Sequence, residues 1–109
     1  MYRTFYNIVR VGYPVEPEKA VELDPTTIVD ELFSRLKEER EYLGLVDDAG
    51  TTLQMMYDGD LKYWVEVPCP EKGGSYGKFF DFSSARELLL GLSGRFPKDG
   101  YAGFEFKSW

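Results

Sequence analysis

Three short strand-like segments follow one another in the middle of the chain, and this succession limits the folds open to it. The segments span 42–47, 51–57 and 61–67. The turns between them, Asp48-Ala49-Gly50 and Asp58-Gly59-Asp60, each contain a glycine that accepts a positive φ. Because connections this short join only antiparallel neighbours, the sequence predicts an antiparallel meander.

The third of these segments alternates regularly between two kinds of side chain. One set is apolar and the other is polar or amphipathic: Leu61, Tyr63, Val65 and Val67 against Lys62, Trp64 and Glu66. A strand of this kind has one face covered by a second layer and the other face open. We therefore expect Trp64 to lie on the uncovered face of the sheet.

The N-terminal part of the chain predicts a strand over 2–11, an irregular connection over 12–23, and then a helix. Asp24 is a suitable N-cap, and Pro25 occupies a position that needs no amide hydrogen. The helix is expected to end near Glu41. Its apolar stripe consists of Ile28, Val29, Leu32, Phe33 and Leu36.

The C-terminal part predicts two more strands and a second helix. Pro68-Cys69-Pro70 should end the third meander strand, because proline cannot donate to a strand ladder. A strand is expected over 77–82. A helix follows, capped by Ser84 and ended by Gly94, and the last strand covers 102–109.

The predicted order is β-α-β-β-β-β-α-β in one domain covering residues 1–109. Two amphipathic helices on one face of a mostly antiparallel sheet make an α+β two-layer sandwich. The sequence does not decide whether the protein is a monomer or a homodimer, although an exposed edge strand would support dimers.

The composition removes the commonest catalytic groups. The chain has no histidine, and its one cysteine, Cys69, lies between two prolines. Histidine is the one side chain whose unperturbed pKa lies near physiological pH, and cysteine is the most accessible nucleophile. The two together dominate zinc ligation, so we predict no catalytic residue, no metal and no cofactor. An enzyme that works through carboxylates, or through a serine and a lysine, stays open as a less favoured alternative.

The charge indicates which partners suit the surface. The net charge is −6, with no cluster of lysine and arginine, so nucleic acid is not expected to bind directly. An acidic face is complementary to a basic protein, although on composition alone solubility is the better explanation of the charge. No apolar run reaches the roughly 20 residues of a membrane span, and the N-terminus does not resemble a signal peptide. We predict a cytoplasmic protein.

Carboxylates and aromatic residues are mixed on the central strands and the loop that follows them. Trp64 beside Glu66 has the chemistry of an interface hot spot. The alternative is that Trp64 packs under a loop and that Asp58 and Asp60 only form a turn. Paired carboxylates such as Asp47 and Asp48 are better explained as solvated turns, and the spacing does not fit a calcium loop. The residues predicted to contact a partner are Asp58, Asp60, Trp64, Glu66, Glu71 and Tyr76.

Segments in the second half of the chain resemble small bacterial toxin-immunity proteins, including the inhibitors found in contact-dependent inhibition and polymorphic toxin loci. The segments are Trp64 to Pro68, the glycine-rich loop after it, Phe80 to Leu89, and Phe104 to Trp109. The likeness is one of pattern: strand, proline, loop, strand, capped helix and terminal tryptophan. It implies a small acidic protein that occludes a cognate toxin, often a nuclease, inside the producing cell.

A second hypothesis is a small-molecule-binding or regulatory module. Its pocket would lie between the sheet and the helices, where Tyr6, Tyr63 and Phe80 are candidates to crowd around one polar group. A bound metabolite would raise the melting temperature of such a module by mass action.

Overall fold

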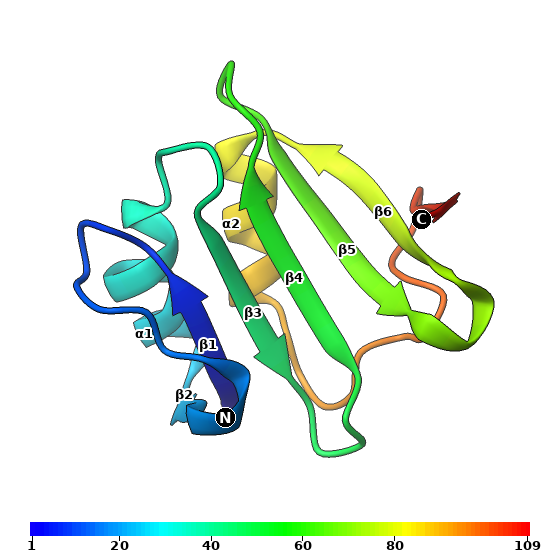
Figure 1. Cartoon of the computed structure of the whole chain (residues 1–109), viewed down its shortest axis with the longest axis horizontal. Helices are drawn as coiled ribbons and strands as arrows, with labels where there is room; N and C mark the ends of the chain where they lie inside the picture. The colour runs from blue at the N-terminus through cyan, green and yellow to red at the C-terminus, as the bar shows by residue number, and fades with distance from the viewer.

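The computed structural model describes all 109 residues as an α+β fold, which confirms the predicted class. One antiparallel sheet of seven strands has the order β2-β1-β3-β4-β5-β6-β7. The strands are β1 (Tyr2–Asn7), β2 (Val21–Leu23), β3 (Tyr42–Val46), β4 (Thr52–Tyr57), β5 (Tyr63–Cys69), β6 (Gly74–Phe80) and β7 (Glu105–Ser108). The helical segments lie behind the sheet in Figure 1 and cover one of its faces.

The first helical segment begins at the predicted place. α1 (Pro25–Thr27) continues as a π-helical turn (Ile28–Leu32) and a 3-10 turn (Phe33–Arg35), and the amide of Thr27 donates to the Asp24 carboxylate at 2.7 Å. All five residues of the predicted apolar stripe are buried against the sheet. The cap and the stripe are therefore confirmed.

The predicted end of this helix at Glu41 is wrong, because the helical segment stops at Arg35. Leu36 turns to an extended conformation, and Arg40 has a φ of 75°. The amides of residues 37 and 38 donate to the Glu41 side chain instead of continuing a helical ladder. A carboxylate farther along the chain thus replaces the backbone acceptors that would have extended the helix.

The second helix, α2 (Phe82–Leu90), is capped by Asp81 and not by Ser84. The Ser84 amide donates to the Asp81 carboxylate at 2.7 Å, which places Ser84 in the first turn. Gly91 ends the helix, whereas Gly94 lies in the following loop with a φ of 65°.

Several strand boundaries also differ from the prediction. β1 ends at Asn7, and β2 forms within a segment that was predicted to be irregular. β5 runs through Pro68 to Cys69. β4 pairs with β5 only as far as Gln54–Glu66, so the missing amide hydrogen of Pro68 breaks no hydrogen bond to β4. A 3-10 turn (Pro70–Lys72) then leads into β6, which begins earlier than predicted, and β7 is shorter than predicted.

The main core lies between the sheet and the helical layer. It joins the buried face of the central strands to the apolar sides of both helical segments, with Phe33, Leu43, Met55, Val65 and Leu89 fully buried. Only one face of the sheet is therefore covered. None of the helices combines the length and the hydrophobicity that a membrane span requires.

Candidate functional site

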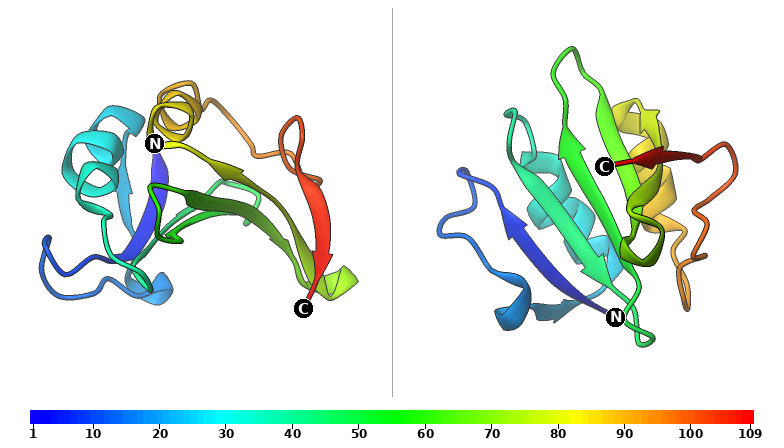
Figure 2. Two further views of the ribbon diagram at one scale, coloured as in Figure 1. Left: turned by 90° about the horizontal axis from the view of Figure 1, so that it is seen from above. Right: turned by 45° about the vertical axis from the view of Figure 1, so that its right-hand side comes forward.

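The uncovered face of the sheet, which we call the open face, is concave. Figure 2 shows the sheet curving away from the helices, so that β1 and β7 rise on either side of β4. The register places residues of several strands on this face, among them Phe5, Tyr42, Gln54, Met56, Trp64, Glu66, Ser75 and Phe79. The curvature forms a shallow trough able to receive a convex partner.

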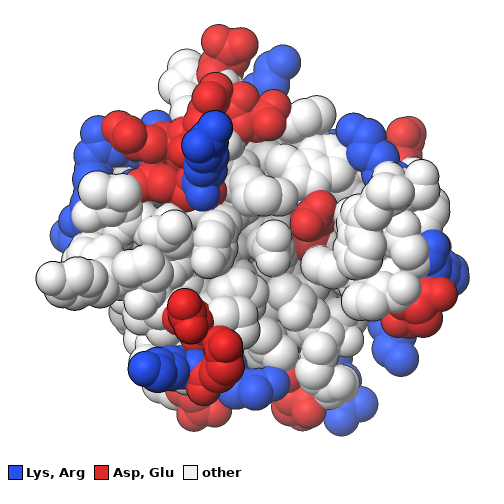
Figure 3. Space-filling view, viewed as in Figure 1, with Lys and Arg blue, Asp and Glu red and all other residues white.

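The floor of this trough is almost free of charge. In Figure 3 the open face is largely white, with most charged groups near the outline of the molecule. Across β3, β4 and β5, the register leaves Glu66 as the one charged side chain on this face. Glu66 is half-buried, so its charge stands in a mostly apolar setting.

Neutral donors hold the Glu66 carboxylate in place. The indole Nε1 of Trp64 donates to Glu66 Oε1 at 2.7 Å, and the buried Ser75 hydroxyl donates to the same oxygen at 3.0 Å. Oε2 has no hydrogen-bond partner in the chain, and the ion pairs of the protein involve other residues. The carboxylate is thus oriented but forms no ion pair within the chain.

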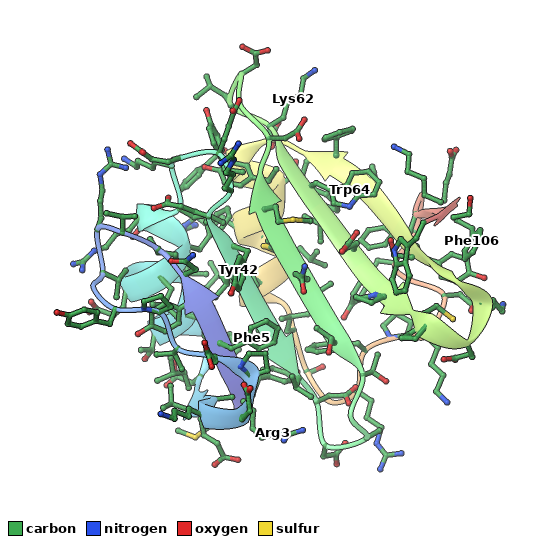
Figure 4. The ribbon with its side chains drawn as sticks, viewed as in Figure 1. Arg3, Phe5, Tyr42, Lys62, Trp64 and Phe106 are labelled. Atoms are coloured by element: carbon green, nitrogen blue, oxygen red, sulfur yellow. The ribbon has the colours of Figure 1, made fainter.

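Trp64 lies flat on the sheet because the neighbouring strand has no side chain beneath it. A Cβ added at Gly77 would lie 2.3 Å from the Cζ2 atom of the indole. Phe79 packs edge-on against the ring at a centroid distance of 4.9 Å, and Lys107 Nζ lies 4.9 Å from the ring centroid. Figure 4 shows Trp64 and Phe5 on this face; the Phe5 ring covers Gly44 in the same way.

These groups surround a shallow cavity of about 280 Å³ between β5, β6 and β7. It combines two carboxylates, one cation, two hydroxyls and three aromatic rings. The lining residues are Asp58, Trp64, Glu66, Ser75, Phe79, Lys107, Ser108 and Trp109.

The structure brings three of the six predicted contact residues together and separates the others. Asp58, Trp64 and Glu66 line one cavity. Asp60 lies next to Asp58 in the exposed β4–β5 turn, with a φ of 50°. Glu71 lies in the turn at the other end of β5, and Tyr76 pairs with Val67 and so lies on the opposite face of the sheet.

The two outlying residues have local partners of their own. Hydrogen bonds from its own backbone amide and from the Cys69 thiol lower the pKa of Glu71. Lys72 Nζ donates to the Tyr76 hydroxyl at 2.9 Å, and this bond raises the pKa of Lys72. These contacts stabilise the turn before β6 and do not extend to the cavity.

The carboxylate pair at the first turn is not the solvated pair that was expected. Asp48 is exposed, but Asp47 is buried and accepts hydrogen bonds from three backbone amides. Asp47 is therefore a structural residue. No group of three or more histidine, cysteine, aspartate or glutamate residues is placed to hold a metal ion.

Sequence reasoning missed Ser75, Phe79, Lys107 and Trp109, because their place in the cavity depends on how β6 and β7 pair. One signal was present: Gly77 interrupts an otherwise strand-like segment. A glycine inside a strand often marks the close approach of another group, here the indole of Trp64.

A second cavity, of about 680 Å³, opens at the end of the helical layer next to the β4–β5 turn. Tyr63 lines it, but Tyr6 and Phe80, the other two residues predicted for a pocket there, do not. Its lining is Arg10, Ser34, Lys37, Tyr57, Leu61, Tyr63 and Phe82.

Comparison with protein families, curated proteins and solved structures finds no match for the chain. The geometry of the open face is therefore the basis on which a function can be inferred.

Replacing Gly77 with alanine should lift Trp64 off the sheet. The added methyl group meets the rigid indole, and Gly77 is not among the glycines with a positive φ, so the side chain itself and not the backbone causes the change. We expect a red-shifted Trp64 emission in a Trp109→Phe background, with a loss of about 1–3 kcal/mol from the free energy of unfolding. Gly50→Ala is the contrasting variant. The added Cβ meets no atom there, but the φ of 85° at this position is strained for alanine. It should leave the emission unchanged, and an unchanged spectrum in Gly77→Ala would contradict the packing described.

Proposed function

We propose that this protein is a non-enzymatic inhibitor that binds a cognate bacterial toxin domain through the open face of its sheet. The fold supplies a concave surface with rigid aromatic groups, and its acidic charge suits a basic partner. The likeness to toxin-immunity proteins makes a toxin, such as a nuclease, the first partner to test. On this proposal the protein acts in the cytoplasm of the toxin-producing cell.

The observation that supports this proposal best is the unpaired carboxylate of Glu66. A half-buried charge on an apolar surface has lost part of its hydration without forming an ion pair in exchange. Two neutral hydrogen bonds fix its direction and leave Oε2 free. An arginine or lysine of the partner would complete the site, with Trp64 and Phe79 covering its alkyl stem.

Glu66→Gln tests the proposal directly. The amide keeps the size of the side chain but removes the charge, so an ion pair with the partner is lost while Trp64 retains an acceptor. We expect binding of the cognate toxin domain to weaken by about 2 kcal/mol or more, roughly 30-fold. Isothermal titration measures the affinity, and growth of cells that express the toxin measures neutralisation.

Glu87→Gln provides a matched control, because it removes the same charge from the exposed surface of α2 in the helical layer. It should leave binding within about 0.5 kcal/mol of the wild type. Equal affinities for the two variants would move the interface away from the open face, and turnover of a substrate by the purified protein would exclude a purely inhibitory role.

Asp58 and Asp60 should affect the rate of association more than the stability of the complex. Both are exposed at the rim, where charges steer the approach of a basic partner. In Asp58→Lys/Asp60→Lys we expect association to slow about tenfold or more at low salt, and its salt dependence to flatten. Stopped-flow measurements at several ionic strengths check this, and unchanged kinetics would place the binding site elsewhere.

The cavity at the end of the helical layer favours a second candidate function, the binding of a small molecule. Tyr57, Leu61 and Phe82 provide apolar lining, and Arg10 and Lys37 add positive charge. This combination suits a small organic anion with an apolar body, such as a carboxylate. A screen of aromatic and aliphatic carboxylic acids by thermal shift tests this function. A rise in melting temperature that Lys37→Ala abolishes would support it, and no rise with any of these acids would count against it.

A further inference from the structure

The two edges of the sheet differ in how well they are protected. β2 has three residues and is followed at once by Asp24 and Pro25, which turn the chain into the first helical segment. β7 has four residues, all of them exposed, and it pairs only with β6. β7 is the last strand in the order of the sheet, and Figure 2 shows it at the side of the sheet away from β1. An unprotected edge of this kind is a template for another strand.

The unpaired backbone groups of this edge can be identified. The amide of Trp109 donates to the carbonyl of Gly73 at 2.9 Å, so the backbone of Trp109 points toward β6. Backbone groups alternate in direction along a strand, so those of Lys107 and Glu105 also point toward β6. The N–H and C=O groups of Phe106 and Ser108 therefore point to the free edge.

The side chains along this edge complement a second copy of themselves. Glu105 and Lys107 lie on the open face on either side of Phe106, and neither forms an ion pair within the chain. In an antiparallel pair centred on Phe106, Glu105 of each copy faces Lys107 of the other. The two outward-pointing Phe106 residues then exchange their N–H and C=O groups as a hydrogen-bonded pair.

The opposite face of the edge adds apolar contact. Phe106 is 43% exposed and packs edge-on against Tyr76 at a centroid distance of 5.3 Å. Figure 4 shows the Phe106 side chain at the margin of the molecule. Pairing about Phe106 brings the two phenyl rings to directly opposite positions, where aromatic cross-strand pairs are favourable.

We propose that two copies of this protein associate through β7, antiparallel and centred on Phe106, to form a homodimer with one continuous sheet. The symmetry axis then runs through the sheet, so both open faces lie on the same side. Because the contact is short, the dimer should be weak and dependent on concentration. The occupant is a second copy because Glu-Phe-Lys is complementary to itself in the antiparallel direction.

Charge exchange at the edge tests this proposal. Sedimentation equilibrium over a range of concentrations should show a dimer for the wild type. Glu105→Lys places cations opposite cations and Lys107→Glu places carboxylates opposite carboxylates, so each variant should raise the dissociation constant about tenfold or more. Circular dichroism checks that both are folded, and Glu87→Lys on α2 controls for net charge and should not weaken the dimer.

Two restorations distinguish this register from any other. An equimolar mixture of E105K and K107E should form heterodimers, because one carries only cations at the edge and the other only carboxylates. The double variant E105K/K107E should recover self-association. The proposal fails if the wild type stays monomeric at the highest concentration, if neither single variant weakens the dimer, or if neither restoration occurs. Glu66→Gln should leave the dimer intact, so this result is independent of the proposed toxin binding.

Discussion

Glu41→Ala is expected to lower the free energy of unfolding by about 3 kcal/mol or more. Glu41 is 4% exposed, and its carboxylate accepts the amide hydrogens of Val9 at 2.8 Å, Lys37 at 3.1 Å and Glu38 at 3.0 Å. Each hydrogen bond to a charged group contributes about 1.5–3 kcal/mol, and the three amides, whose bonds are partly buried, regain some of this from water once the carboxylate is gone. Because these terms overlap, the total is smaller than their sum. Even so, it is a large part of the ~5–15 kcal/mol typical of a small domain.

The effect should be specific to the carboxylate and not to the loss of any glutamate nearby. Glu38 lies in the same segment, but its side chain is exposed and only approaches Arg10 at 3.7 Å. Glu38→Ala should therefore cost no more than about 0.5–1 kcal/mol in urea denaturation. Glu41→Gln should fall between the two. Both carboxylate oxygens now accept hydrogen bonds from backbone amides, and the side-chain NH2 group of glutamine would place a donor opposite some of these amides. Equal midpoints for Glu41→Ala and Glu38→Ala would contradict this account.

Glu41 also illustrates why the first helix could be predicted only in part. Its start depends on neighbouring residues, because Asp24 caps the amide of Thr27 and the apolar stripe from Ile28 to Leu36 follows from local spacing. Its end depends on a side chain that connects the loop after β1 to the segment before β3. No periodicity in the sequence indicates such a contact between distant segments.

The candidate site, too, could be predicted only where it depends on the local sequence. Strand alternation was enough to place Trp64 and Glu66 together on the uncovered face, because a period of two residues fixes which side chains share a face. Alternation could not predict that Ser75 and Lys107 lie near these two residues, because their positions depend on the pairing of β6 with β5 and β7. Tyr76 lies on the other face because β6 begins three residues earlier than predicted and pairs it with Val67.

Asp47→Ala is the second substitution expected to have a large effect, with a loss of about 3 kcal/mol in the free energy of unfolding. One carboxylate oxygen accepts the amides of Ala49 and Thr51, both at 2.9 Å, and so closes the β3–β4 turn. The other accepts the buried amide of Phe96 at 2.8 Å, which fixes the loop after α2 against that turn. Phe96 in turn stacks on Tyr2 of β1 with ring centroids 5.0 Å apart.

The neighbouring residue again supplies the control. Asp48 binds Arg95 at 2.8 Å, but 76% of the Asp48 side chain and 69% of the Arg95 side chain are exposed, so Asp48→Ala should cost less than about 1 kcal/mol. Asp47→Asn should separate the two roles of the carboxylate. The side-chain carbonyl oxygen of asparagine can still close the turn. Its NH2 group, however, would face the Phe96 amide, so that a donor lies opposite a donor. Hydrogen exchange should then speed up at the Phe96 amide and leave those of Ala49 and Thr51 nearly unchanged, because the turn keeps its acceptor while the loop loses its own. Equal acceleration at all three amides would mean that the turn and the loop open as one unit.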